Sequence, residues 1–201
     1  MENSQQKNTH IKISKNIFDA IPYIKEGKLV VAKTDTIYGI LADALNKEAV
    51  EKIYKVKGRP EDKPFIILIP SSHNLKKFNV KPDPQGEKIL NIKGITVIFD
   101  IEDPTGEFYY LHRGKNSLGF RISDDPVFLS FLKELGRPVV APSANPSDLQ
   151  PAEDIEKAIE YFKDSIDLYI DSGKVEKNVP STIVKVENGK IKVIREGSKR
   201  L

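Results

Sequence analysis

The stretch Leu29-Val30-Val31-Ala32 runs directly into Lys33-Thr34-Asp35-Thr36-Ile37-Tyr38-Gly39, and the fold prediction starts from this junction. Four consecutive apolar residues predict a buried strand. The hydroxyls of Thr34, Thr36 and Tyr38 follow on alternate residues, which places them on one side of an extended chain. Ligands of open sheets bind where strands end, so this segment is a candidate site. Thr and Tyr also favour ordinary strands, and the pattern alone leaves both interpretations open.

Helices and strands alternate on both sides of this stretch. Apolar residues at helical spacing predict helices over 17–24, 49–54, 127–135 and 155–162, with an N-cap at Asn46 and C-terminal glycines at Gly27, Gly58 and Gly136. Apolar and β-branched runs predict strands over 65–69, 95–101, 108–111, 118–122, 139–141 and 168–170, and Asn188-Gly189 predicts a type I′ hairpin. This order favours one layered domain of the α/β (α+β) class, with helices packed on a mixed, twisted sheet.

Composition excludes several classes of protein. The 201 residues are 39% hydrophobic, 30% charged and 8% aromatic, which is typical of a globular chain. No segment approaches the roughly 20 apolar residues that a bilayer span needs, so we expect a cytoplasmic protein with no membrane partner. Thirty-two Lys and Arg against 29 Asp and Glu give a net charge of +3. This charge permits anionic partners but is too small to indicate a dedicated nucleic-acid surface.

The residue inventory also excludes common catalytic machinery. The chain has no cysteine, and its three histidines, His10, His73 and His112, are scattered. Thiol chemistry, disulfides and Cys- or His-based metal sites are therefore not expected. We expect His112 to lie at the surface. A G-x-x-x-x-G-K-[ST] loop is missing, because Tyr109 stands where its first glycine would precede Gly114-Lys115.

A short connection between a predicted helix and a predicted strand concentrates cations. Its sequence is Lys57-Gly58-Arg59-Pro60-Glu61-Asp62-Lys63-Pro64, and its two prolines restrict its conformations. A guanidinium fork and two ammonium groups are suited to the roughly four negative charges of a nucleoside triphosphate. A solvated loop whose own acidic residues neutralise its lysines is the alternative that spacing alone leaves open.

Three further segments carry polar side chains at strand ends. Pro142-Ser143-Ala144-Asn145-Pro146-Ser147 follows a predicted strand and combines small side chains with a hydroxyl and an amide. Pro180-Ser181-Thr182-Ile183-Val184 begins another strand, and Arg195-Glu196-Gly197 lies beyond the final hairpin. Each segment by itself is equally consistent with an ordinary turn or strand.

Taken in order, these segments resemble the YrdC/TsaC family, the threonylcarbamoyl-AMP synthases. The matching motifs are T-[DE]-T-x-Y-G at 34–39, K-x-R-x-x-x-K-P at 57–64, S-A-N at 143–145, P-S-T-[IV]-V at 180–184 and R-x-G at 195–197. The resemblance covers nearly the whole chain. It implies a YrdC-like three-layer domain over 1–201, with a twisted mixed β-sheet flanked by helices. It also implies the short single-domain form, with a flexible N-terminus at 1–12.

The resemblance implies a reaction as well. Family members condense L-threonine, bicarbonate and ATP to threonylcarbamoyl-AMP and pyrophosphate, for threonylcarbamoyladenosine modification of tRNA. Mg²⁺ would accompany ATP without a dedicated protein metal site, and a tRNA-modifying transferase complex would receive the product. Such chemistry depends on positioning and charge neutralisation and needs no histidine or cysteine.

Roles carry over to this chain motif by motif. The implied catalytic residues are Lys57, Arg59 and Ser143. The implied threonine-binding residues are Thr34, Arg121 and Thr182, with Arg121 resembling the family's arginine that pairs the threonine carboxylate. The implied ATP-binding residues are Lys57, Arg59, Lys63, Ser117, Ser143, Asn145 and Arg195. Thr36 and Tyr38 are as consistent with support of the loop as with contact to a ligand.

Several positions depart from the family pattern, among them Lys93, Ile95 and Asp148. Lys93 and Ile95 stand where the family has prolines, and Asp148 stands where a glycine often follows S-A-N-x-S. Two alternative functions stay open beside the synthase. One is a module with weak RNA binding through the same cations, which would show a steep salt dependence. The other is a paralogue that acts on another carbamoyl acceptor.

Overall fold

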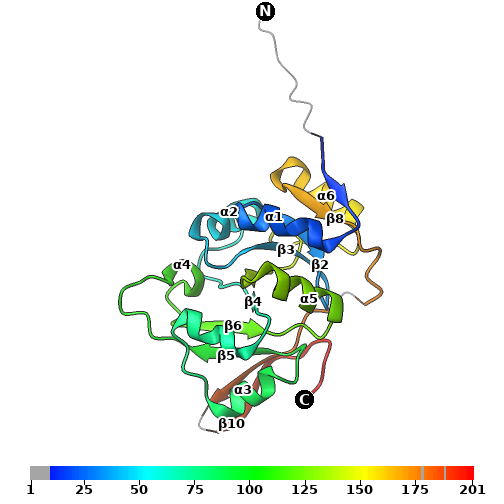
Figure 1. Ribbon diagram of the computed structural model, residues 1–201. Helices are drawn as coiled ribbons and strands as arrows, with labels where there is room; N and C mark the ends of the chain where they lie inside the picture. Colours follow the sequence, from blue (N-terminus) through cyan, green and yellow to red (C-terminus); the bar gives the residue numbers. More distant parts are fainter. Residues whose placement is uncertain (1–9, 178, 188) are drawn as a thin grey trace, which may run out of the picture.

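The strands of the chain form one mixed sheet in the computed structural model, which describes residues 10–177, 179–187 and 189–201 (Figure 1). They are β1 (Ile13–Ser14), β2 (Val30–Lys33), β3 (Tyr38–Asp43), β4 (Ile67–Leu68), β5 (Thr96–Asp100), β6 (Ser117–Arg121), β7 (Val139–Val140), β8 (Leu168–Ile170), β9 (Ile183–Glu187) and β10 (Lys190–Arg195). Their order across the sheet is β1-β8-β2-β3-β7-β4-β6-β5-β9-β10. The pairs β1–β8, β2–β8, β4–β6 and β5–β9 are parallel and the others antiparallel, so the sheet is mixed.

Helices cover both faces of this sheet and give three layers. They are α1 (Ala20–Lys25), α2 (Lys47–Lys57), α3 (Pro84–Leu90), α4 (Tyr109–His112), α5 (Pro126–Leu135) and α6 (Ile155–Phe162), with 3₁₀ turns at Ile17–Asp19, Ser72–Phe78 and Lys163–Ser165. Alternate residues of β2 enter opposite cores: Val31 packs with α2 and α6, whereas Val30 and Ala32 pack with α1 and α5. Figure 1 shows α6 at one end of the molecule and α3 with β10 at the other. The predicted mixed sheet flanked by helices is confirmed.

The ends of α2 are specified by the sequence. Asn46 Oδ1 accepts a hydrogen bond from the Ala49 amide at 3.0 Å and so caps the first turn. Gly58 ends the helix with φ of 58°, a left-handed conformation that glycine adopts without strain. The cationic connection therefore leaves α2 at a fixed point.

Most predicted elements form where the pattern placed them. The predicted helices correspond to α1, α2, α5 and α6, and the predicted strands to β2 and β4 to β8. β4 is shorter than predicted, with two residues in place of the run 65–69. The β9–β10 pair confirms the terminal hairpin, with Glu187 opposite Lys190. Asn188, in the predicted type I′ turn, lies outside the described residues.

The prediction of a strand over 108–111 is wrong, because this segment forms the short helix α4. The Phe108 amide donates to Asp103 Oδ2 at 2.9 Å. The amides of Leu111 and His112 then donate to the Phe108 carbonyl at 2.8 and 3.1 Å. A short apolar run fits a helical turn as well as a strand, and here the aspartate fixes the start of the turn.

Several other elements were not predicted, among them α3 and β3. Pro84 and Gly86 are residues that usually interrupt a helix, yet α3 begins at Pro84, because Asp83 Oδ1 accepts from the amides of Gln85 and Gly86. Proline is suited to the first position of a helix, where its missing N–H costs no bond. β3 starts at Tyr38, inside the segment expected to leave the sheet, and pairs antiparallel with β2.

His112 is buried, with 3% of its surface exposed, and the prediction of a surface position is wrong. Its Nδ1 accepts from the amides of Gly114 and Asn116 at 3.1 and 3.3 Å. The proton of the neutral ring therefore resides on Nε2, which donates to Asp103 Oδ2 at 3.0 Å. His112 closes the turn between α4 and β6, a structural role.

The N-terminal prediction is only partly within the described chain. Residues 1–9 of the expected flexible segment 1–12 lie outside the described residues. The Lys12 carbonyl accepts from the Tyr169 amide at 2.9 Å, which joins this end to β8. Among the helices of the described residues, none combines the length and apolar character needed to cross a membrane.

Candidate active site

A cleft of about 360 Å³ lies against the sheet on the side opposite α2 and α3. Strand alternation forms its wall. Arg121 and Ile183 line the cleft, whereas their neighbours Phe120 and Val184 enter the core beneath α2 and α3. Its polar lining side chains are Arg59, Arg121, Arg195, Thr34, Thr36, Ser143 and Ser181. Every predicted motif therefore contributes to one cleft, although not always through the expected residue.

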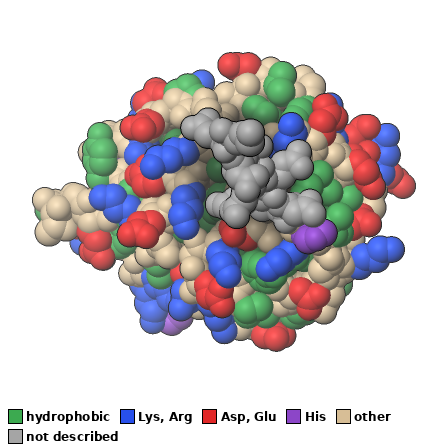
Figure 2. Space-filling view, turned by 90° about the horizontal axis from the view of Figure 1, so that it is seen from above, with side chains coloured by type: hydrophobic (Ala, Val, Ile, Leu, Met, Phe, Trp, Pro, Cys, Tyr) green, Lys and Arg blue, Asp and Glu red, His purple; other side chains and the backbone are tan. Residues whose placement is uncertain are grey.

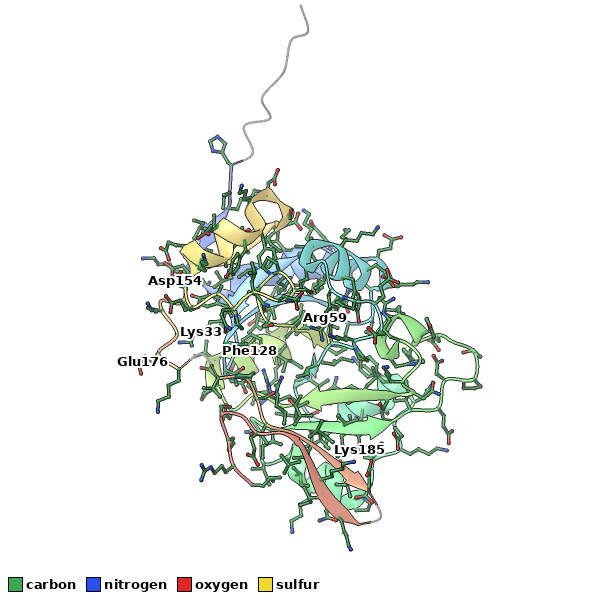
Figure 3. The ribbon with its side chains drawn as sticks, turned by 180° about the vertical axis from the view of Figure 1, so that it is seen from behind. Lys33, Arg59, Phe128, Asp154, Glu176 and Lys185 are labelled. Carbon is green, nitrogen blue, oxygen red and sulfur yellow. The ribbon has the colours of Figure 1, made fainter. Side chains whose placement is uncertain are left out.

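Arg59 reaches the cleft from the connection after α2. Its Nε donates to the Lys63 carbonyl at 3.3 Å, and its guanidinium lies over the ring of Phe65, 5.3 Å from the centroid. Figure 3 shows Arg59 near the middle of the molecule, well separated from Lys185 on β9, the strand next to the edge strand β10. Burial lowers the pKa of Arg59 from its usual value, which indicates a partly desolvated cation.

Lys57 does not line the cleft but is buried beside it, where it fixes the 143–145 loop. Its side chain is 2% exposed, and Nζ donates to the Ser143 carbonyl and, at 2.5 Å, to the Asn145 carbonyl. The Lys57 carbonyl accepts from the Ser147 amide at 2.8 Å. The K-x-R and S-A-N motifs are thus joined directly. Burial, with a smaller contribution from the Arg59 charge, lowers the pKa of Lys57 to about 7.

A tight turn places the first predicted motif in the cleft. Thr34 Oγ1 donates to the Ile37 carbonyl at 2.9 Å and accepts from the Thr36 amide at 3.2 Å. Tyr38 points away, since its hydroxyl donates to the Gly173 carbonyl at 2.8 Å and accepts from the Ser172 amide. Thr34 and Thr36 therefore line the cleft, and Tyr38 ties β3 to the segment after β8.

Arg121 is held by Asp35, the acidic position of the motif at 34–39, for which the sequence predicted no role. Arg121 Nη2 lies 2.8 Å from Asp35 Oδ1, and both side chains are at most 5% exposed. The contact is an ion pair without hydrogen-bond alignment, because Asp35 Oδ1 and Arg121 Nε have no hydrogen-bond partner among the described residues. Burial raises the pKa of Asp35, partly offset by Arg121, and burial lowers the pKa of Arg121.

The third arginine comes from the end of β10. Arg195 donates from Nε and Nη2 to the Ser181 carbonyl at 3.1 and 2.7 Å. The chain then crosses Pro180–Thr182 so closely that a Cβ on Gly197 would lie 2.3–2.4 Å from that backbone. Only glycine fits at this crossing. Burial, together with the Arg121 charge, lowers the pKa of Arg195.

Thr182 and Ser117 do not reach the cleft. Thr182 faces the opposite side from Ser181 and Ile183, where its hydroxyl donates to the Lys199 carbonyl. Ser117 begins β6 opposite Asp100, four residues and roughly 13 Å from Arg121 at a strand's rise of about 3.3 Å per residue. Their assignments to threonine and ATP stay predictions. Strand alternation in P-S-T is the signal that could have indicated Ser181.

Lys63 and Asn145 lie beside the cleft rather than in its wall. The Lys63 side chain is exposed, and its carbonyl is the acceptor for Arg59. Asn145 Nδ2 donates to the carbonyls of Pro146 and Leu149 at 2.9 and 2.8 Å, which shapes the loop. Their roles as ATP ligands also stay predictions.

Two departures from the family pattern occupy left-handed backbone. Asp148 has φ of 68° and Lys93 has φ of 67°. Glycine would adopt this conformation with less strain, and aspartate is one of the side chains that tolerate it best. The loop after S-A-N therefore keeps the turn that a glycine would give.

The arrangement of charge indicates the kind of ligand. Three guanidinium groups line the cleft, and no carboxylate is among its lining residues in the described chain. An anion of several charges with hydroxyl or amide groups would satisfy these donors. The described residues hold no group of three His, Cys, Asp or Glu side chains suited to a metal ion.

Comparisons with known proteins agree with this geometry. The family model described as telomere recombination (Sua5, YciO and YrdC) matches residues 22–197. A Methanocaldococcus jannaschii protein is 34% identical over 178 residues, covering 87% of this chain and 82% of the relative. The threonylcarbamoyl-AMP synthase of Marinobacter nauticus is 32% identical, covering 81% and 87%. The crystal structure of P. abyssi Sua5 complexed with L-threonine superposes with a TM-score of 0.80 at 28% identity, over 94% of this chain and 58% of that chain.

Proposed function

The chain belongs to the Sua5/YciO/YrdC family, and we propose that it is a threonylcarbamoyl-AMP synthase that condenses L-threonine, bicarbonate and ATP, with release of pyrophosphate. The observation that carries the proposal is the convergence of Arg59, Arg121 and Arg195 with Thr34 and Ser143 in one cleft. A nucleotide polyphosphate and an amino-acid carboxylate both need such donors. The reaction itself is inferred from relatives that are named threonylcarbamoyl-AMP synthases.

In the proposed reaction the N-carboxylated threonine attacks ATP. A carbamate oxygen forms a bond to the α-phosphorus, the bond from that phosphorus to the bridging oxygen breaks, and pyrophosphate leaves with the electron pair. Charge moves onto the leaving oxygens, so cations fixed beforehand lower the barrier. Mg²⁺ bound to ATP would neutralise part of this charge and travel with the substrate.

The residues divide between the two substrates. Arg59 and Arg195 bind the polyphosphate, and Arg121 binds the threonine carboxylate beside the Thr34 hydroxyl. Ser143 offers a hydroxyl between them, on a loop whose position Lys57 fixes through the carbonyls of Ser143 and Asn145. None of these side chains needs to exchange a proton during turnover. The chain therefore acts by orientation and charge, in keeping with the absence of cysteine.

RNA binding by the same cations is less well supported. The face in Figure 2 mixes Lys and Arg with Asp and Glu outside its grey area, rather than presenting a patch of one sign. The arginines that would serve such a surface line the cleft, and Lys57 is buried.

We propose that the product passes to a tRNA-modifying transferase and that the protein is located in the cytoplasm. Action on another carbamoyl acceptor is the second candidate.

Pyrophosphate release tests the proposal. The purified chain should release pyrophosphate when ATP, bicarbonate, Mg²⁺ and L-threonine are all present, and omission of threonine should stop the release. L-Serine, which lacks the methyl group, is the matched control for the amino-acid pocket. Equal release with and without threonine, in an assay where a verified synthase responds, would reject the synthase. Release that required a different amino acid would support the paralogue.

A further inference from the structure

Four side chains form a continuous row from the interior to the cleft. The Arg113 guanidinium lies 4.0 Å from the ring centroid of Tyr54, and Tyr54 stacks on Phe65 with centroids 4.1 Å apart and planes at 25°. Phe65 in turn lies beneath the guanidinium of Arg59. We call Arg113, Tyr54, Phe65 and Arg59 the arginine–aromatic row. Each contact is of the cation–π or offset-stacked type that is attractive between such groups.

The row is rigid at its inner end. Tyr54 and Phe65 are 3% and 4% exposed, and the Arg113 side chain is 8% exposed. Glu51, one turn before Tyr54 on α2, holds Arg113 Nη2 at 2.9 Å. Desolvation strengthens cation–π attraction, so the buried members of the row have little freedom to slide. Only the Arg59 end faces the cleft as a cation.

A shared hydrogen-bond acceptor, one backbone carbonyl, also connects Tyr54 with Arg59. The Lys63 carbonyl accepts from Tyr54 Oη at 3.0 Å and from Arg59 Nε at 3.3 Å. Tyr54 therefore fixes both the ring under Arg59 and the acceptor that orients it. No hydrogen bond or ion pair occupies the two Nη groups of Arg59 within the described residues, which leaves both for a ligand.

We propose that Tyr54 is a positioning residue that sets the Arg59 guanidinium for the polyphosphate, acting through Phe65 and the Lys63 carbonyl. The proposal rests on the proposed function, because it takes ATP as the ligand of Arg59. Neither the sequence motifs nor the reaction uses Tyr54, Phe65 or Arg113. Arg59 makes no ion pair among the described residues, although the Asp62 charge acts on it. Its direct contacts are the Phe65 ring and the Lys63 carbonyl, both of which Tyr54 holds.

Nucleotide affinity measured apart from turnover tests the inference. We expect Tyr54→Leu, which removes the ring, to weaken ATP binding about tenfold by calorimetry. We expect Tyr54→Phe, which keeps the ring and removes the bond to Lys63, to weaken it about threefold. The KM for ATP should rise by the same factors, whereas the KM for threonine stays within twofold. Tyr23→Leu is the matched control, since Tyr23 on α1 also lies under a cation, Lys28 at 5.3 Å, away from the cleft.

The outcomes separate the inference from the function. If wild-type protein binds ATP but releases no pyrophosphate with threonine, the proposed synthase fails, and the ratio of ATP affinities still decides the role of Tyr54. If Tyr54→Leu keeps the wild-type ATP affinity, the inference is overturned. A merely structural role would lower the thermal midpoint and the active fraction of Tyr54→Leu, with both KM values unchanged. If Tyr54→Leu does not fold, Tyr54→Phe decides, and an unchanged affinity in that variant overturns the inference.

Discussion

Arg59 and Arg121 face the same cleft, but the molecule holds them in different ways. Arg121 has a buried carboxylate, Asp35, at 2.8 Å. Arg59 has an aromatic ring below it and a neutral carbonyl as its acceptor. The first arrangement is close to neutral as a pair, whereas the second keeps a full positive charge. We call the part of the cleft beside Arg59 the Arg59 wall and the part beside Arg121 the Arg121 wall. The two walls differ in the net charge that they present to a ligand.

This difference supports the proposed binding of ATP beside Arg59 and of threonine beside Arg121. A monoanionic carboxylate needs directed donors but little net charge, which the Arg121–Asp35 pair supplies. A polyphosphate carries several charges, and no carboxylate is among the described residues that line the cleft around Arg59, although the charge of nearby Asp62 acts on Arg59 from outside that lining. The comparison teaches that charge compensation around an arginine, and not the presence of the arginine alone, indicates its ligand.

The largest expected effect comes from the uncompensated wall. Arg59→Ala should lower kcat/KM for ATP by about 10²–10³-fold, because a desolvated donor to charge that develops during the reaction is lost. The unfolding free energy should change little, since Arg59 makes no ion pair in the described chain. Steady-state kinetics at saturating threonine measures the first and urea denaturation the second. A tenfold or smaller effect would contradict the proposed contact with ATP.

The compensated wall should respond mainly in stability. Asp35→Asn leaves the buried Arg121 charge without its partner and should lower the unfolding free energy by about 3–5 kcal/mol in urea. Asp124→Asn is the control, because Asp124 is an exposed carboxylate close to Asp35 that pairs with Lys199. Its loss should be about 0–1 kcal/mol. Similar losses in both variants would show that the Asp35–Arg121 pair is not the buried, dependent pair described above.

Lys57 should make the stability of the Arg59 wall depend on pH. Its pKa is about 7 in the folded protein and 10.5 for a lysine fully exposed to water, so between these values the unfolded chain binds more protons. The unfolding free energy therefore rises with pH across this window, by up to about 1.4 kcal/mol per unit. Denaturation of wild-type protein and Lys57→Met between pH 7 and 9.5 measures the difference in slope. Parallel slopes would argue against a depressed pKa.

The smallest expected effects separate two adjacent residues of one strand. Ser181→Ala removes a cleft hydroxyl that lies 2.8 Å from Thr96 Oγ1, and should raise the KM for threonine about threefold. Thr182→Val faces the other side and should leave this KM unchanged, with a loss of about 1 kcal/mol in stability from its bond to Lys199. The reverse pattern in KM would restore Thr182 as the threonine ligand.

Local signals in the sequence predicted much of this molecule. Asn46 and Gly58 specified the ends of α2. The cations of 57–64 made this connection a candidate site, and Arg59 lines the cleft, although spacing alone also left a solvated loop open. These features depend on neighbouring residues, which a single sequence displays. The short apolar run 108–111 was misread because its helical turn depends on Asp103.

The missed features depend on contacts between distant segments. Asp35 and Arg121 are 86 positions apart, and no local pattern joins them. The site of Lys57 depends on carbonyls of the 143–145 loop, so its sequence indicated a cation but not its burial. Tyr54 fits the apolar face of α2, and its stacking on Phe65 follows only from the folded connection.

The fixed imidazole of His112 can serve as an NMR probe of the folded protein. Two backbone amides point at Nδ1 and Asp103 faces Nε2, so a single tautomer should give one distinct pair of ring nitrogen resonances. With His10 and His73 as the other histidines, selective ¹⁵N labelling would yield a spectrum simple enough to assign by eye. The Nε2 proton, shielded from water, should exchange slowly and report opening of the 112–116 turn. Nucleotide titrations followed at this signal would reveal whether ligand binding stabilises a region outside the candidate cleft.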